Sequence, residues 1–154
     1  MAKRVLLEIH NAPAFYTLTG ISCHLRDYRL SYLLNENLCF RLVKLADRPV
    51  LPPGAREPVS FSFYRWRDED RYNTYYLITN RSEDTLLVPQ MKQADFLLLV
   101  EGPFKKKQHE DLLARLRKVP NINTAFGIPF SAVKNYENIL TDLEIHLNVL
   151  PKQP

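Results

Sequence analysis

Residues 85–101 read TLLVPQMKQADFLLLVE, two apolar runs that flank a polar segment opened by Pro89 and closed by Asp95. The second run, 97–100, is far too short to cross a membrane, and the dipeptide Gly102-Pro103 follows soon after it. A continuous apolar run bounded in this way is typical of a strand that is buried on both faces. We therefore expect 97–100 to form the central strand of a sheet.

The chain has 154 residues, enough for one core that buries roughly two thirds of the surface of the unfolded chain. We expect a single α+β domain over 1–150 and a frayed tail over 151–154. No apolar run is long enough to span a membrane, and residues 1–11 lack a signal-peptide pattern, which predicts a cytoplasmic protein. Cys23 and Cys39 have no metal-ligand spacing, and in a reducing compartment we expect both to be free thiols.

Upstream of the central strand, alternating aromatic residues predict antiparallel strands. Residues 59–67 and 72–79 alternate on either side of the acidic tip 68–70 and are expected to form a hairpin. Residues 86–88 would add a third strand to this meander. Residues 48–58 contain four prolines and are predicted to be a loop.

The remaining segments divide into strand and helix patterns. Alternation predicts further strands at 5–9, 39–46 and 122–128. Apolar residues at helical spacing predict three helices, at 22–37 with Ser22 as cap after a turn at Gly20, between Pro103 and Pro120, and after Ser131. This order of elements predicts an α+β fold, with a largely antiparallel sheet and about three helices packed on it.

Residues 88–96, VPQMKQADF, resemble the signature that names the IPExxxVDY family of small bacterial proteins. The resemblance covers most of the chain, through segments in the same order at 20–30, 61–64, 75–78, 80–82 and 124–126. It implies a cytoplasmic single domain, in a family whose members have no assigned biochemical activity.

The signature segment departs from the family pattern at four of its six named positions. Only Pro89 and Asp95 are kept, whereas Ile, Glu, Val and Tyr of the signature are replaced by Val88, Gln90, Ala94 and Phe96. Neither Gln90 nor Phe96 titrates in water, so neither can supply acid, base or metal-ligand chemistry. We therefore expect a structural role, in which Pro89 opens a turn and Asp95 accepts hydrogen bonds from backbone amides.

The strongest chemical cluster in the sequence consists of Cys23, His24, Asp27 and Tyr28, which on a helix would share one turn. A hydrolase or metal site at Cys23, His24 and Asp27 is one hypothesis. However, adjacent helical residues project about 100° apart, and no glycine-rich elbow supplies an oxyanion hole. We expect a packed helix start with no catalytic residue and no metal. The four isolated glycines form no phosphate-binding loop, so no cofactor is expected.

Basic residues gather within 103–118, where six basic side chains oppose two acidic ones, a local excess equal to the net charge of +4 of the whole chain. Beside an aromatic hairpin, such a stretch can contact phosphates and stack bases, as RNA-binding modules do. The acidic tip 68–70 weakens this interpretation, and no RRM, KH or cold-shock motif is present. The candidate contacts to RNA or to an acidic protein partner are Lys105, Lys106, Lys107, Arg115, Arg117, Lys118, Tyr64, Trp66, Tyr72 and Tyr75.

Because no set of catalytic residues converges, the sequence favours a non-enzymatic cytoplasmic binding or adaptor module with a protein partner. RNA binding is the alternative from a different class. Homo-oligomerisation stays open at this stage.

Overall fold

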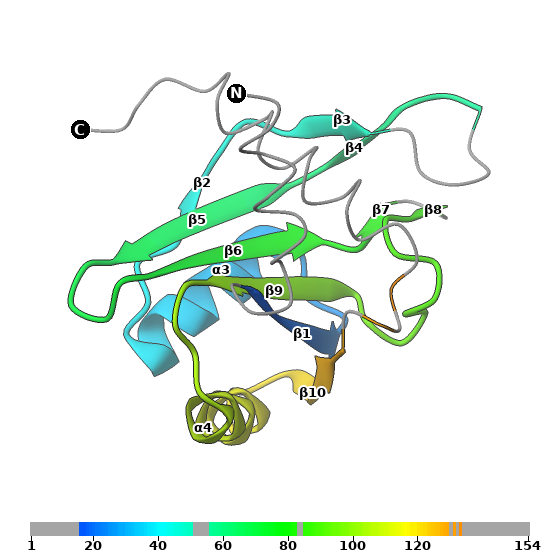
Figure 1. Ribbon diagram of the computed structural model, residues 1–154. Helices are drawn as coiled ribbons and strands as arrows, with labels where there is room; N and C mark the ends of the chain where they lie inside the picture. Colours follow the sequence, from blue (N-terminus) through cyan, green and yellow to red (C-terminus); the bar gives the residue numbers. More distant parts are fainter. Residues whose placement is uncertain (1–15, 51–55, 83–84, 130, 132, 134–154) are drawn as a thin grey trace, which may run out of the picture.

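The structure is a computed structural model that describes residues 16–50, 56–82, 85–129, 131 and 133 (Figure 1). These residues form an α+β fold with ten strands and two helices. In chain order the elements are β1 (Tyr16–Cys23), α3 (Asp27–Leu38), β2 (Val43–Lys44), β3 (Arg48–Val50), β4 (Val59–Phe61), β5 (Phe63–Asp68), β6 (Asn73–Thr79), β7 (Arg81–Ser82), β8 (Thr85–Leu86), β9 (Phe96–Glu101), α4 (Lys106–Arg117) and β10 (Ile122–Ile128). The predicted strand at 5–9, the helix after Ser131 and the tail at 151–154 fall outside the described residues or at their margin.

Six strands form the main sheet in the order β10-β1-β9-β6-β5-β2, and all neighbouring strands are antiparallel. The central strand predicted at 97–100 is confirmed as β9, which pairs with β1 on one side and β6 on the other. Leu97 and Leu99 contribute to the hydrophobic cluster on one face of the sheet, while Leu98 and Val100 contribute to the cluster on the other. Buried neighbours on both faces explain why this run is apolar throughout.

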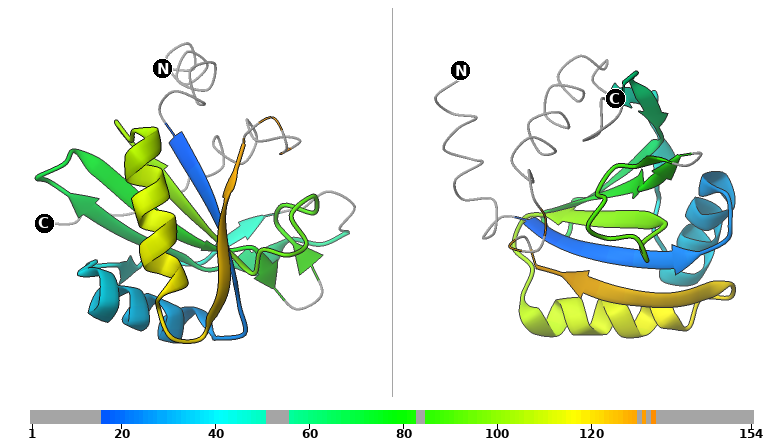
Figure 2. Two further views of the ribbon diagram at one scale, coloured as in Figure 1. Left: turned by 90° about the horizontal axis from the view of Figure 1, so that it is seen from below. Right: turned by 90° about the vertical axis from the view of Figure 1, so that its right-hand side faces the viewer.

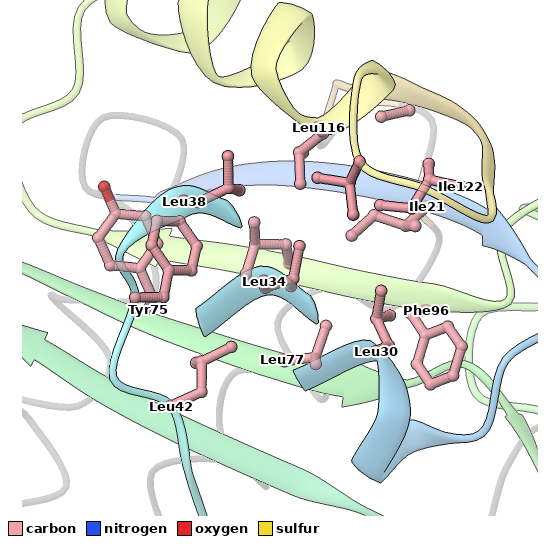
Figure 3. Close-up of a cluster of buried hydrophobic side chains, with 14 of the residues drawn as sticks. Ile21, Leu30, Leu34, Leu38, Leu42, Tyr75, Leu77, Phe96, Leu116 and Ile122 are labelled. Atoms are coloured by element: carbon pink, nitrogen blue, oxygen red, sulfur yellow. The ribbon is translucent and has the colours of Figure 1, made fainter. Parts of the chain in front are cut away.

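Both described helices pack against the same face of the sheet (Figure 2). Leu30, Leu34 and Leu38 repeat every four residues along α3, so their side chains line the side of the helix that faces the sheet. Leu112 and Leu116 do the same for α4. Figure 3 shows how leucines of both helices converge with apolar side chains of the sheet: Leu30, Leu34, Leu38 and Leu116 with Ile21, Leu77 and Phe96.

The first predicted helix begins later than the sequence pattern indicates. Gly20 and Ser22 lie within β1, so the expected turn and cap are wrong, and α3 begins at Asp27. Gly20 is not a turn residue but a point of close approach, because a Cβ atom there would lie 2.7 Å from the Phe126 ring. Pairing of β1 with strands on both sides therefore overrides the local helix pattern.

The hairpin prediction is confirmed for β5 and β6, which pair from Phe63–Ile78 to Asp68–Asn73. The first part of the strand expected at 59–67 is instead the separate strand β4, which pairs with β3 outside the main sheet. The neighbours of the hairpin also differ from expectation. The strand expected at 39–46 shrinks to β2, because the side chain of Asn35 holds both backbone groups of Leu42 at 2.9 and 3.3 Å. The loop expected at 48–58 contains β3, and the strand expected at 86–88 contributes only β8, which pairs with β7 outside the main sheet.

Candidate functional site

The polar cluster predicted on one helical turn is not assembled there. Cys23 ends β1 and is buried, and this burial is the main cause that raises the pKa of its thiol. His24 is exposed in the connection that follows, and Tyr28 is 60% exposed on the outer side of α3. Cys23 and Asp27 therefore belong to different elements, and the expected packing within one turn is wrong.

Asp27, the first residue of α3, has a structural task. The hydroxyl of Tyr64 donates a hydrogen bond to its Oδ2 atom at 2.9 Å, and Lys44 Nζ lies 3.9 Å from the same oxygen. Burial and this hydrogen bond both raise the pKa of Tyr64. These contacts tie the start of α3 to β5 and β2. Within the described part of the chain, no group of three or more His, Cys, Asp or Glu residues is placed to hold a metal ion.

The side chain of Asn80, a fully buried residue, holds the backbone of the signature segment (88–96) by hydrogen bonds. The side-chain amide of Asn80 donates to the carbonyls of Met91 at 3.1 Å and Ala94 at 2.7 Å, and its oxygen accepts from the Val88 amide at 2.7 Å. Val88 and Ala94 are buried, whereas Gln90 is exposed, as expected from its place in a turn. No sequence pattern had marked Asn80 for this role.

Asp95 fastens the other end of the segment to the sheet. Its Oδ2 accepts a hydrogen bond from the Cys23 amide at 3.0 Å, and its Oδ1 lies 3.3 Å from Arg81 Nε. Its own amide donates to the carbonyl of Ile21 at 2.9 Å, and Phe96 follows as the first, buried residue of β9. The carboxylate of Asp95 thus accepts a hydrogen bond from a backbone amide at the point where the chain re-enters the sheet.

The basic residues of 103–118 are spread along α4. Lys105, Lys106 and Lys107 are exposed at its amino-terminal end, where the helix dipole is positive and like charge is unfavourable. At the other end Arg117 Nε donates to the carbonyl of Ala125 at 3.0 Å, which fastens the helix to β10, and Lys118 is exposed. Arg115 is the member of this set that points to a hollow.

A hollow of about 520 Å³ lies between the end of α3, the tip of the β5–β6 hairpin and α4, and we call it the hairpin hollow. Of the residues predicted from sequence, it brings together Trp66, Tyr75 and Arg115. Tyr64 is not among them because its ring is buried and its hydroxyl is bound to Asp27. The residues that line the hollow are Leu38, Cys39, Phe40, Arg41, Trp66, Arg67, Asp68, Glu69, Asp70, Arg71, Tyr75 and Arg115.

Three aromatic rings form the floor of the hairpin hollow. Trp66 and Tyr75 face each other across β5 and β6 and stack at 5.0 Å with an interplanar angle of 18°. The ring of Phe40, a residue that no sequence pattern marked, lies 4.8 Å from each of these two rings between centroids. Figure 3 shows Tyr75 beside Leu38, with its hydroxyl pointing away from the apolar cluster. Burial is the main cause that raises the Tyr75 pKa, and Asp68 adds to it while Arg71 and Arg115 act against it.

The rim of the hairpin hollow carries four arginines and three carboxylates. Arg67 is engaged, since it lies 3.8 Å from Glu69 and donates to Thr74 Oγ1 at 2.9 Å. Arg41, Arg71 and Arg115 are exposed and form no ion pair with the described residues. A hydrogen bond of 3.1 Å from Arg115 to the carbonyl of Leu38 fixes this guanidinium at the rim. No sequence pattern had marked Arg41 or Arg71.

Neither described helix has the length and apolar character needed to cross a membrane. Cys23 and Cys39 are both free thiols, the first buried and the second exposed at the end of α3. A scan against protein-family models finds no model that matches the chain, and a search of the curated proteins finds no match.

Proposed function

We propose that this protein is a non-enzymatic binding or adaptor module of the IPExxxVDY family, and that the hairpin hollow is its binding surface. The observation that carries the proposal is the convergence of Trp66, Tyr75 and Arg115, from two strands and one helix, with the exposed guanidiniums of Arg41 and Arg71. Aromatic and arginine side chains are the residue types most enriched in the parts of interfaces that dominate binding.

The contacts of the signature segment support the non-enzymatic part of this proposal. Asn80 and Asp95 use their polar atoms to hold the backbone, and Gln90 lies in solvent. A family signature with a structural task tolerates the change from Glu to Gln at an exposed position. The geometry gives no comparable support to hydrolysis, since Cys23 and Asp27 lie on different elements and Asp27 is engaged by Tyr64.

RNA binding is the second candidate function, and the make-up of the hollow supports it. The aromatic hairpin and the basic helix, which are separate in the sequence, contribute Trp66 and Arg115 to the same hollow. Phe104, just before the lysine-rich end of α4, contacts Tyr75 edge to face at 6.4 Å. Basic side chains combined with an aromatic floor are a common arrangement in proteins that bind single-stranded nucleic acid.

The proposed function is tested by affinity purification from the native cell, with and without ribonuclease. Wild type is compared with the double variant Arg41→Glu/Arg71→Glu and with Arg29→Glu, a matched control on exposed helix surface that does not line the hollow. We expect the double variant to lose the wild-type partners at unchanged melting temperature and the control to keep them. Partners retained by the double variant contradict the proposal.

The ribonuclease arm and a gel shift separate the two partner classes. Partners that survive ribonuclease are proteins that bind directly, whereas partners that disappear are held through RNA. In the gel shift, RNA affinity should fall steeply as salt rises, because arginine contacts to phosphates release counterions. Absence of any complex at tens of micromolar protein near physiological salt removes the RNA candidate.

A further inference from the structure

We propose that the hairpin hollow holds one nucleotide, with its base against the aromatic floor and its phosphate among the arginines of the rim. The nucleotide is a free nucleoside phosphate or one unit of a single-stranded RNA, two sources that share this chemistry. The inference rests on the proposed function, because it names the ligand class of the same surface.

The size of the hollow suits one small ligand. Pockets that enclose a small organic molecule typically measure about 300–1,000 Å³, and the hairpin hollow measures about 520 Å³. One base with its sugar and phosphate fits within this range, while a longer strand must continue outside along the surface. The volume therefore favours recognition of a single unit.

The floor offers an aromatic ring that is fixed before a ligand arrives. Trp66 is half-buried and lines the hollow, while stacking on Tyr75 and contact with Phe40 hold its indole in place. A ring that is already ordered loses little conformational freedom on binding. Every base has a flat π-face, so such a floor accepts any of the four.

The rim offers the groups that a phosphate needs. Guanidinium groups bind phosphate oxygens through paired hydrogen bonds, and Arg41, Arg71 and Arg115 have no carboxylate partner among the described residues. Arg67 marks the contrast, because Glu69 and Thr74 already engage it. The phosphate contacts thus come from side chains, which agrees with the lack of a glycine-rich loop.

The carboxylates of the rim favour a nucleotide over an acidic protein segment. Asp68 and Asp70 line the same hollow as the open arginines. They are hydrogen-bond acceptors, suited to the amino groups of a base and the hydroxyls of a ribose. The side chains of an acidic peptide offer only acceptors, so they cannot donate a hydrogen bond to these carboxylates. A ligand with donors as well as a phosphate matches both kinds of group.

Trp66 is the only tryptophan of the chain, so its fluorescence reports directly on the hollow. The experiment titrates wild-type protein with adenosine 5′-monophosphate, adenosine, inorganic phosphate and a short single-stranded adenylate RNA. We expect the monophosphate and the RNA to quench Trp66, and adenosine and phosphate to bind at least about tenfold more weakly, because each keeps one half of the contacts. The double variant Arg41→Glu/Arg71→Glu should weaken nucleotide binding at least about tenfold, and Arg29→Glu should leave it unchanged.

Tighter binding of the RNA than of the monophosphate identifies RNA as the source, and equal or weaker binding identifies the free nucleotide. The inference is overturned when neither probe quenches Trp66 at millimolar concentration, when the double variant binds as well as wild type, or when inorganic phosphate binds as tightly as the nucleotide. Loss of cellular partners in the double variant without any nucleotide effect on wild type leaves the binding module standing and removes the nucleotide.

Discussion

The signature segment and the hairpin hollow are both rich in polar groups, but they use them in opposite ways. Around the signature, Asn80 and Asp95 direct their side-chain atoms at backbone groups of the same chain. Around the hollow, Arg41 and Arg71 are exposed and form no ion pair with the described residues. Polar groups that are satisfied internally hold the fold, whereas charged groups gathered over an aromatic floor and left open are available to a partner.

The largest expected effect is a loss of stability when a side chain of the central strand β9 is shortened. Leu98 is fully buried in β9, with neighbours that cannot all collapse into a gap. Leu98→Ala should lower the free energy of unfolding by about 2–5 kcal/mol, measured by chemical denaturation. Leu113→Ala, at a half-buried position on α4, serves as the control and should cost clearly less. Equal losses at the two positions contradict the central place of β9.

The second effect tests the internal use of polar groups. Asn80→Ala removes three hydrogen bonds. The buried Val88 amide loses its acceptor and the Ala94 carbonyl loses its side-chain donor, while the Met91 carbonyl keeps only the Ala94 amide, so the change should cost about 2–4 kcal/mol. Asn37→Ala is the matched control, because its one side-chain bond, to the Leu33 carbonyl, is exposed. Denaturation curves that shift equally for the two variants show that Asn80 does not hold the signature segment.

The third effect is a pH dependence at the α4 interface. His109 Nε2 lies 2.8 Å from Thr19 Oγ1, and burial lowers the pKa of His109 below its ordinary value of 6.5. The fold therefore favours the neutral ring, and its stabilising contribution is present above pH 6.5 and is lost as pH falls through the lowered value. Wild type should lose more stability on acidification than His109→Gln, by less than the Asn80 effect because the ring is partly exposed. Parallel stability curves for the two proteins between pH 7 and 5 contradict this assignment.

The fourth effect is the smallest and concerns the exposed turn of the signature. Gln90→Glu introduces the residue that the resembled signature has at a position that faces solvent, so stability should change by less than about 1 kcal/mol. Urea denaturation beside Leu98→Ala measures it. A larger shift than that of the leucine variant means that the side chain of Gln90 is not in free solvent.

Local sequence patterns predicted the parts of the fold that depend on a strongly apolar run or on pairing between neighbouring segments. The run at 97–100 and the alternation around 68–70 identified β9 and the β5–β6 hairpin, because burial on both faces and strand alternation leave direct marks in sequence. Gly20 was misread as a turn, since its close approach to Phe126 depends on a strand more than 100 residues away.

For the same reason, the sequence predicted only part of the candidate site. The basic stretch and the aromatic hairpin pointed to Arg115 and Trp66, yet their meeting depends on how α4 crosses the sheet. Phe40 and Arg41 come from the segment after α3, which the sequence assigned to a strand. Asn80 escaped notice because its partners lie 8 to 14 residues further along the chain. Contacts of this kind carry no local pattern.

The central claim is that the hairpin hollow binds the partner of this protein, whereas the signature segment stabilises the fold. The most direct measurement compares two single, exposed changes that each lower the net charge by one, Arg41→Gln in the hollow and Gln90→Glu in the signature turn. For each purified variant, the free energy of unfolding and the amount of partner recovered per molecule are measured beside wild type. We predict unchanged stability within about 0.5 kcal/mol for Arg41→Gln together with a clear loss of partner, and full recovery for Gln90→Glu. Full recovery for Arg41→Gln with loss for Gln90→Glu would contradict the account.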